Sequence, residues 1–177
     1  VAKARSLGIE LGNYPETTQQ ILDEVKQREA QGYSYEVADG SLAILLLRHL
    51  GRYKPHFTLE SFRVIVDDRE DTGALAKDAM SEATIKIHVG DKRFVATGEG
   101  AGPVEALDVA LRMAIGEFFP EVEQMELVDF KVRILDENVG TGAITRVLIT
   151  TSDGAALWGT VGVSENIIEA SWNALVD

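Results

Sequence analysis

The sequence predicts an α+β fold in which a βββα unit occurs twice, after a helical lead-in. Three observations predict it: an internal repeat, period-two alternation of apolar residues in short segments, and three helical patterns before residue 57. Residues 98–111 and 162–175 share five identities at an offset of 64: Gly98, Glu105, Ala106, Ala110 and Leu111 against Gly162, Glu169, Ala170, Ala174 and Leu175. We expect a helical linker at 1–57 and a pseudo-two-fold domain at 58–177, with copies at 58–119 and 125–177.

The lead-in contains three helical patterns, each closed by a glycine. Residues 1–8 resemble the last turns of a helix that stops at Gly8. Thr17 or Thr18 can cap a second helix that ends at Gly32. A third helix, at 41–50, is apolar nearly all round and ends at Gly51. Such a helix must be covered on several sides, so we expect it to dock on the following module or on another subunit.

Each copy of the repeat has three strand patterns and one helix pattern. The first copy has strands at 62–66, 84–89 and 93–98, a Gly90-Asp91 turn, and a helix from Pro103. The second has strands at 130–134, 145–151 and 156–163, an Asp153-Gly154 turn, and a last helix capped by Ser164. The apolar stripes of the two helices predict their buried residues: Val104, Leu107, Leu111 and Phe118 in the first, and Ile168, Ser171, Trp172 and Leu175 in the second.

Composition excludes several classes of function. The 177 residues carry a formal charge of −12, which argues against nucleic acid and anionic membranes as partners. There is no Cys, so disulfides and thiolate metal sites are excluded, and a cytoplasmic location is expected. No apolar run reaches the length of a membrane span. The absence of an initiator Met and the abrupt ends lead us to expect a fragment of a longer chain.

The strand-to-helix junction at 98–103 (GEGAGP) is the sharpest candidate site. Its glycines allow the backbone to expose N–H groups, and the following helix directs its positive end at the loop, which suits a phosphate or a carboxylate. The alternative is a tight turn without a ligand. A dinucleotide site is a weaker alternative, because the glycines do not follow the G-x-G-x-x-G spacing. We also expect the loop at 136–143, with Gly140 and Gly142, to be a hairpin loop or a cover for a ligand. We expect no catalytic or metal-ligating residues, and the three histidines are scattered.

Three runs resemble the C-terminal regulatory domain of the isopropylmalate synthase and citramalate synthase family: residues 98–112, 127–149 and 158–175. Residues 3–46 resemble the linker subdomain of its citramalate synthase branch. The resemblance implies a parent enzyme that condenses acetyl-CoA with a 2-oxo acid on a barrel that needs a divalent metal and lies outside this chain. It also implies a homodimeric, non-catalytic feedback sensor for isoleucine or leucine, coupled to its own barrel and with no cofactor of its own.

The same resemblance implies the positions that contact the effector: Gly100, Gly102, Val104, Leu127, Phe130, Ile134, Thr141 and Ala143. Ala101 and Phe130 depart from the Asn and Tyr that many family members carry. Glu99 or Asp129 could hold the ammonium group of an amino acid. The alternatives are leucine as the effector, a dimerisation module without an effector, and a nucleotide-binding domain.

Overall fold

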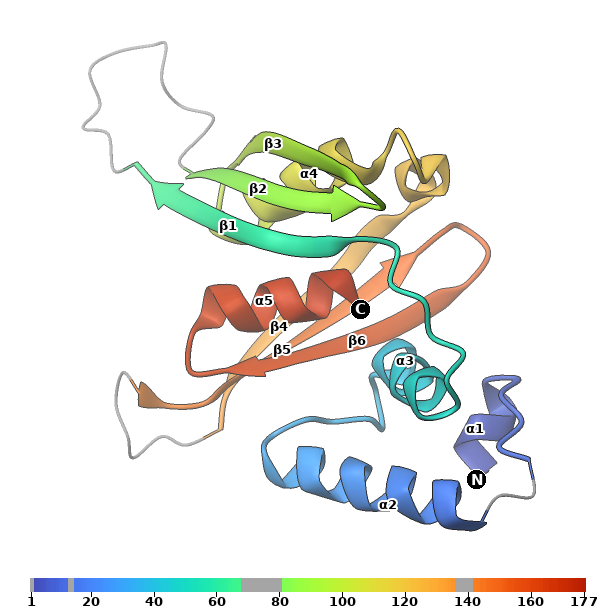
Figure 1. The fold of residues 1–177 in the computed structure, drawn as a ribbon. Coiled ribbons are helices and arrows are strands. Elements are labelled where there is room, and N and C mark those ends of the chain that lie inside the picture. The colour runs from blue at the N-terminus through green and yellow to red at the C-terminus, as the bar shows by residue number, and fades with distance from the viewer. Residues whose placement is uncertain (1, 13–14, 68–80, 136–141) are drawn as a thin grey trace. The chain divides into compact units, whose positions relative to one another are not determined.

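The structure is a computed structural model that describes residues 2–12, 15–67, 81–135 and 142–177. Three helices come first: α1 (Ala2–Ser6), α2 (Pro15–Ala30) and α3 (Asp39–His49). The first repeat contains β1 (Thr58–Val66), β2 (Ser81–Val89), β3 (Lys92–Gly100) and α4 (Pro103–Ile115). A 3-10 turn, η1 (Pro120–Gln124), leads to the second repeat, with β4 (Glu126–Ile134), β5 (Thr145–Ser152), β6 (Leu157–Ser164) and α5 (Ile167–Val176) (Figure 1).

The predicted α+β architecture with two βββα units is confirmed. The two antiparallel sheets have the orders β1-β2-β3 and β4-β5-β6. Residues 55–125 form one compact unit, and residues 1–54 together with 126–177 form another. The linker helices therefore pack with the second repeat. The predicted boundary between a linker at 1–57 and a domain at 58–177 divides the chain by sequence position, and it stays a prediction.

The duplication extends to an irregularity in the first strand of each repeat. The β1–β2 register shifts between Leu59 and Ser61, and the β4–β5 register shifts between Leu127 and Asp129, which is 68 residues later. A shift of this kind is a β-bulge, in which one extra residue bends an edge strand. A bulge at the same place in both copies is a detail that chance repetition of strand patterns would not produce.

The repeated glycines and alanines have a common packing role. A Cβ on Gly98 would lie 2.5 Å from the Ala110 nitrogen, and a Cβ on Gly162 would lie 1.8 Å from the Ala170 oxygen. In each repeat the helix backbone therefore rests directly on a glycine of the third strand. Ala106, Ala110, Ala170 and Ala174 are buried at this contact, because only small side chains allow so close an approach.

Several local predictions are confirmed. Gly8, Gly32 and Gly51 have the positive φ expected of glycines that end helices. Gly90 and Gly154 have positive φ in the two hairpin turns, and the Asp153 carboxylate accepts hydrogen bonds from the Ala155 and Ala156 N–H groups.

Other local predictions are wrong. Ser164 does not cap α5, because the Asn166 side chain accepts from the Ile168 and Glu169 N–H groups, and Ser164 donates to the Glu169 carboxylate instead. The second helix starts at Pro15, before the predicted threonine caps, because proline fits a first helical turn. Phe118 lies beyond the end of α4 and packs edge-to-face on Phe94.

The third helix docks on the following module, which is one of the two covers that the sequence predicts. Leu42, Leu45 and Leu46 of α3 belong to a buried cluster that includes Val161 of β6. A Cβ on Gly40 would lie 2.9 Å from the Gly159 oxygen, so helix and strand are in backbone contact. In the described residues no helix is long and apolar enough to cross a membrane.

Candidate functional site

The junction between β3 and α4 presents an open helix N-terminus. Gly102 is the N-cap residue of α4, with φ −149° and ψ 169°, and no side chain caps the helix there. Pro103 has no N–H, and the N–H groups of Val104 and Glu105 lie in the first turn, where a helix offers no internal acceptor. These donors and the positive end of the helix dipole favour an anion at this position.

One donor of the junction is already in use. The Ala101 N–H donates to the Glu105 carboxylate over 2.8 Å, so this side chain reaches back to the residue before the N-cap, one position earlier than in a capping box. A ligand carboxylate at the helix start would lie near that negative charge. The junction therefore offers the remaining first-turn amides of α4 and not the Ala101 amide.

The two glycines of the predicted site differ in whether the fold has room for a side chain at their position. A Cβ on Gly100 would lie 2.7 Å from the Ala106 nitrogen and 2.9 Å from the Glu105 Cβ, so Gly100 is needed for the packing of α4 on its strand. A Cβ on Gly102 meets nothing within 4 Å, and its extended backbone suits any residue. Only Gly102 can therefore be changed without disturbing the fold.

The predicted apolar contacts on β4 form a row on one face. Leu127, Phe130 and Ile134 pair with Thr151, Ile149 and Thr145 of β5, which lie on the α5 side of the sheet. The bulge at residue 128 brings Leu127 to the same face as Phe130, although three positions separate them. Phe130 is 37% exposed and Ile134 is 54% exposed, so the edge strand presents apolar surface that α5 does not cover.

The remaining predicted contacts follow this strand. The Leu135 N–H donates to the Ile144 oxygen, which ties the buried Ala143 to the end of β4 that carries Ile134. Thr141 lies outside the described residues, as does most of the predicted loop at 136–143. Of the two candidates for the ammonium group, Asp129 forms an ion pair with Lys131. Gly100, Gly102 and Val104 belong to the 55–125 unit, and the β4 row and Ala143 belong to the other unit.

Comparing the two repeats shows a feature that our sequence reasoning missed. At the offset of 64 residues, Gly102 corresponds to Asn166. The Asn166 oxygen accepts from the Ile168 N–H over 2.9 Å and from the Glu169 N–H over 3.4 Å, so α5 satisfies its own first donors. The α4 start lacks such a side chain. The alignment that revealed the repeat already contained this signal. It pairs Gly102 with Asn166, so the two copies carry different residues at the helix N-cap.

A polar cluster lies on the face of the first sheet that α4 does not cover. Arg93 holds the Glu60 carboxylate through two hydrogen bonds, of 2.6 and 2.9 Å, and His88 lies 3.1 Å from the same group. The hydrogen bonds from Arg93 lower the pKa of Glu60 to about 2. The cluster is exposed to solvent. No group of three or more potential metal ligands gathers in the ranges that the structure describes.

The fold and the junction define a duplicated βββα domain with one open and one self-capped helix N-terminus. Residues 36–177 match the family described as the LeuA allosteric (dimerisation) domain, and the chain belongs to that family. The resemblance noted in the sequence is thus confirmed.

The chain is similar along its whole length to known (R)-citramalate synthases. It is 49% identical to the one from Streptomyces coelicolor, over 99% of this chain and 32% of that protein. It is 42% identical to the one from Aquifex aeolicus, over 100% of this chain and 33% of that protein. A 2-isopropylmalate synthase from Pseudoalteromonas atlantica is 29% identical over 56% of this chain and 18% of that protein. The chain spans about a third of the length of these citramalate synthases.

Proposed function

We propose that this chain is the amino-acid-sensing and dimerisation part of a citramalate synthase-like enzyme, and that isoleucine binding to it inhibits that enzyme. The family description and the (R)-citramalate synthase relatives support this proposal. The parent would condense acetyl-CoA with pyruvate in the cytoplasm, on a metal-dependent barrel that is not part of this chain. In that arrangement isoleucine is an end product, so its binding would provide feedback.

The observation that carries the proposal is the difference between the two helix starts. Asn166 fills the first-turn donors of α5, whereas Gly102 leaves those of α4 open. A cap present in one copy and absent from the other therefore favours a ligand that supplies the missing acceptor, and the carboxylate of an amino acid is such a group.

The exposed apolar row on β4, taken by itself, favours a ligand with an apolar group such as a branched side chain. Burial of a C4 side chain against Leu127, Phe130 and Ile134 is worth roughly 1.5–3 kcal/mol. The difference between isoleucine and leucine is the position of one methyl branch, worth about 1 kcal/mol of fit. The relatives favour isoleucine, because five (R)-citramalate synthases match over nearly the whole chain.

Inhibition of the parent requires that isoleucine bind one arrangement of the homodimer more tightly than another. Coupling energies of about 1–3 kcal/mol are typical and would lower activity several-fold to a hundredfold. Helix α3 packs directly on the second repeat, and in this proposal the linker passes the effect of binding to the rest of the parent enzyme.

Calorimetric titration of the chain with isoleucine, leucine and valine tests the proposal. We expect binding of isoleucine, and loss of that binding in Gly102→Asp. An aspartate at this N-cap stabilises α4 but places a carboxylate where the ligand's would lie. The matched control is Gly102→Ala, which adds a methyl group in open space. Unaltered isoleucine affinity in Gly102→Asp, or no heat with any of the three amino acids, would contradict the proposal.

A dimerisation module without an effector is the second candidate. The hydrogen bond from Ala101 to Glu105 favours it, since the protein's own carboxylate already uses one donor of the junction. Under this alternative Gly102→Asp raises the melting temperature, and no amino acid shifts the melting temperature of either variant.

A further inference from the structure

Three of the four sheet edges are protected against pairing with another strand. The bulges after Leu59 and Leu127 interrupt the outer strands β1 and β4. The edge of β6 is covered by the start of α3. Asp39 accepts from the Gly159 N–H over 2.7 Å, and Ser41 accepts from the Val161 N–H over 2.9 Å. These two N–H groups therefore point away from β5, toward the open side of β6.

The edge of β3 has neither kind of protection. Its ladder with β2 runs through nine consecutive pairs, from Ser81↔Gly100 to Val89↔Lys92, without a register shift. At the repeat offset, Val95 and Thr97 correspond to Gly159 and Val161, so their N–H groups point to the open side as well. Within the described ranges, the N–H groups of Val95 and Thr97 have no hydrogen-bond acceptor on the open side of β3. Val95 is 52% exposed.

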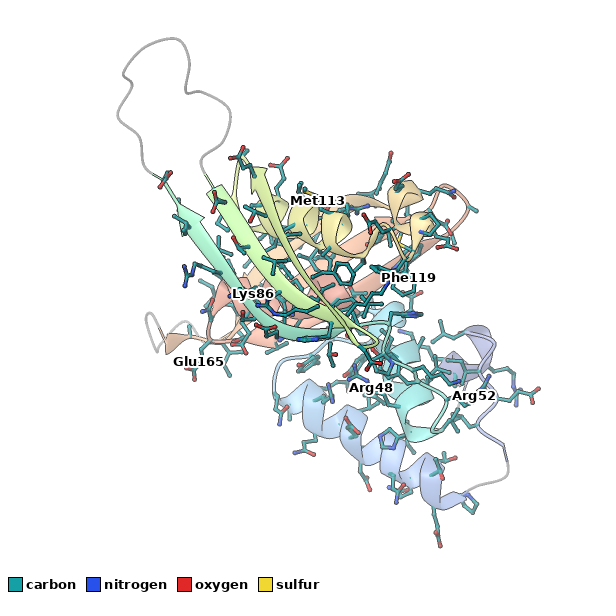
Figure 2. All side chains as sticks on the ribbon, turned by 45° about the horizontal axis from the view of Figure 1, so that its top comes forward. Arg48, Arg52, Lys86, Met113, Phe119 and Glu165 are labelled. Atoms are coloured by element: carbon teal, nitrogen blue, oxygen red, sulfur yellow. The ribbon has the colours of Figure 1, made fainter. Side chains whose placement is uncertain are left out.

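Apolar surface lies on the flank of α4 above this edge. Ala106 and Ala110 rest on Gly98 of β3, and Val109 and Met113 continue the same side of the helix beyond them. Met113 is 60% exposed on α4 (Figure 2). An unbranched, flexible side chain of this kind is common in contacts between proteins.

The equivalent flank of the second repeat is polar and covered. Asn173 and Asp177 occupy the positions of Val109 and Met113 at the repeat offset. Asp177 forms a hydrogen bond with Ser41 of α3, and burial raises its pKa. The linker thus closes both the strand edge and the helix flank in the second repeat. The same two surfaces of the first repeat, with apolar residues on the flank, need a different cover.

We propose that a second copy of this chain covers them, with β3 pairing antiparallel to β3 of the partner about a two-fold axis at Ala96. This register pairs Val95 with Thr97 and places the basic Arg93 opposite Glu99, so the strand is complementary in charge to itself. Val109 and Met113 of the two α4 helices then pack across the axis. The inference rests on the proposed homodimer and assigns its surface.

Cysteine cross-linking tests the register, because the chain contains no Cys. In the proposed pairing Ala96 faces Ala96 of the partner across the axis as a non-hydrogen-bonded pair. Their Cβ atoms would lie about 4.5 Å apart, which is close to the separation that a disulfide requires. We expect Ala96→Cys to form a covalent dimer on mild oxidation. The control Ala155→Cys lies at an exposed turn and should stay uncross-linked. Absence of a cross-link with Ala96→Cys in a dimeric protein would overturn the proposed register.

The Met113→Lys variant tests the helix flank. A lysine in the last turn of α4 suits the helix dipole, so folding is kept, but in the dimer two charges would meet on apolar surface. Sedimentation should show the dimer dissociation constant raised by about tenfold or more, whereas Leu157→Lys, at another exposed apolar position, should leave it unchanged. Unchanged dissociation with Met113→Lys would overturn the surface. A wild-type chain that is monomeric at high concentration would instead overturn the proposed homodimer itself.

Discussion

Replacing Gly162 with alanine tests the packing that the two repeats share. The new Cβ would lie 1.8 Å from the Ala170 oxygen, 2.8 Å from the Ala170 carbonyl carbon and 2.9 Å from the Ala174 nitrogen. Contacts between carbon and oxygen are not much shorter than about 3.3 Å, so α5 must move about 1.5 Å away from β6. That movement would loosen Trp172 and Ala174, both of which are buried.

Overpacking of a core costs typically about 1–3 kcal/mol. The obstacle here is helix backbone, which cannot turn aside as a side chain can, so we expect a loss at the upper end, about 3 kcal/mol. Equilibrium unfolding in urea, followed by Trp fluorescence, measures it. Gly102→Ala, where a Cβ meets nothing, should stay within about 0.5 kcal/mol of the wild type. If Gly162→Ala unfolds at the wild-type urea concentration, the reasoning about the glycine contact is refuted.

Three further predictions concern single interactions. Asn166→Ala should lower the free energy of unfolding by about 1 kcal/mol in urea, because α5 loses its cap; no loss would contradict the cap assignment. Ser41→Ala should cost about 1–3 kcal/mol and speed hydrogen exchange at Val161, whose buried N–H loses its acceptor; unchanged exchange would argue against that bond. Because the pKa of Glu60 is depressed to about 2, its contribution to stability is present above about pH 4.5 and lost as pH falls toward 2. Melting curves of Glu60→Gln should lack that part of the acid loss, and acid profiles identical to the wild type would contradict it.

The sequence was sufficient where local chemistry decides the structure. Glycines at helix ends, the Asp153-Gly154 turn and the proline at the start of α4 were located correctly, because each is favoured by its own backbone conformation. The repeat offset also paired the correct residues. Its physical reason, the backbone contact at Gly98 and Gly162, appears only when strand and helix are seen together.

The sequence was insufficient where two side chains compete for one role. Ser164 and Asn166 both can cap a helix, and their order along the chain does not decide which one does. Gly100 and Gly102 look alike in the sequence, yet only Gly100 is pressed against α4. Docking of α3 on β6 was expected only in general terms, since the Asp39 and Ser41 contacts join residues 120 positions apart.

The central claim is that the open start of α4 receives the carboxylate of a branched amino acid. Titration of the 15N-labelled chain with L-isoleucine, followed by NMR at each amide, tests it most directly. We predict large shifts at the Val104 and Glu105 amides and almost none at Ile168 and Glu169, whose N–H groups Asn166 already holds. Equal shifts at both helix starts, or shifts confined to other parts of the chain, would contradict it.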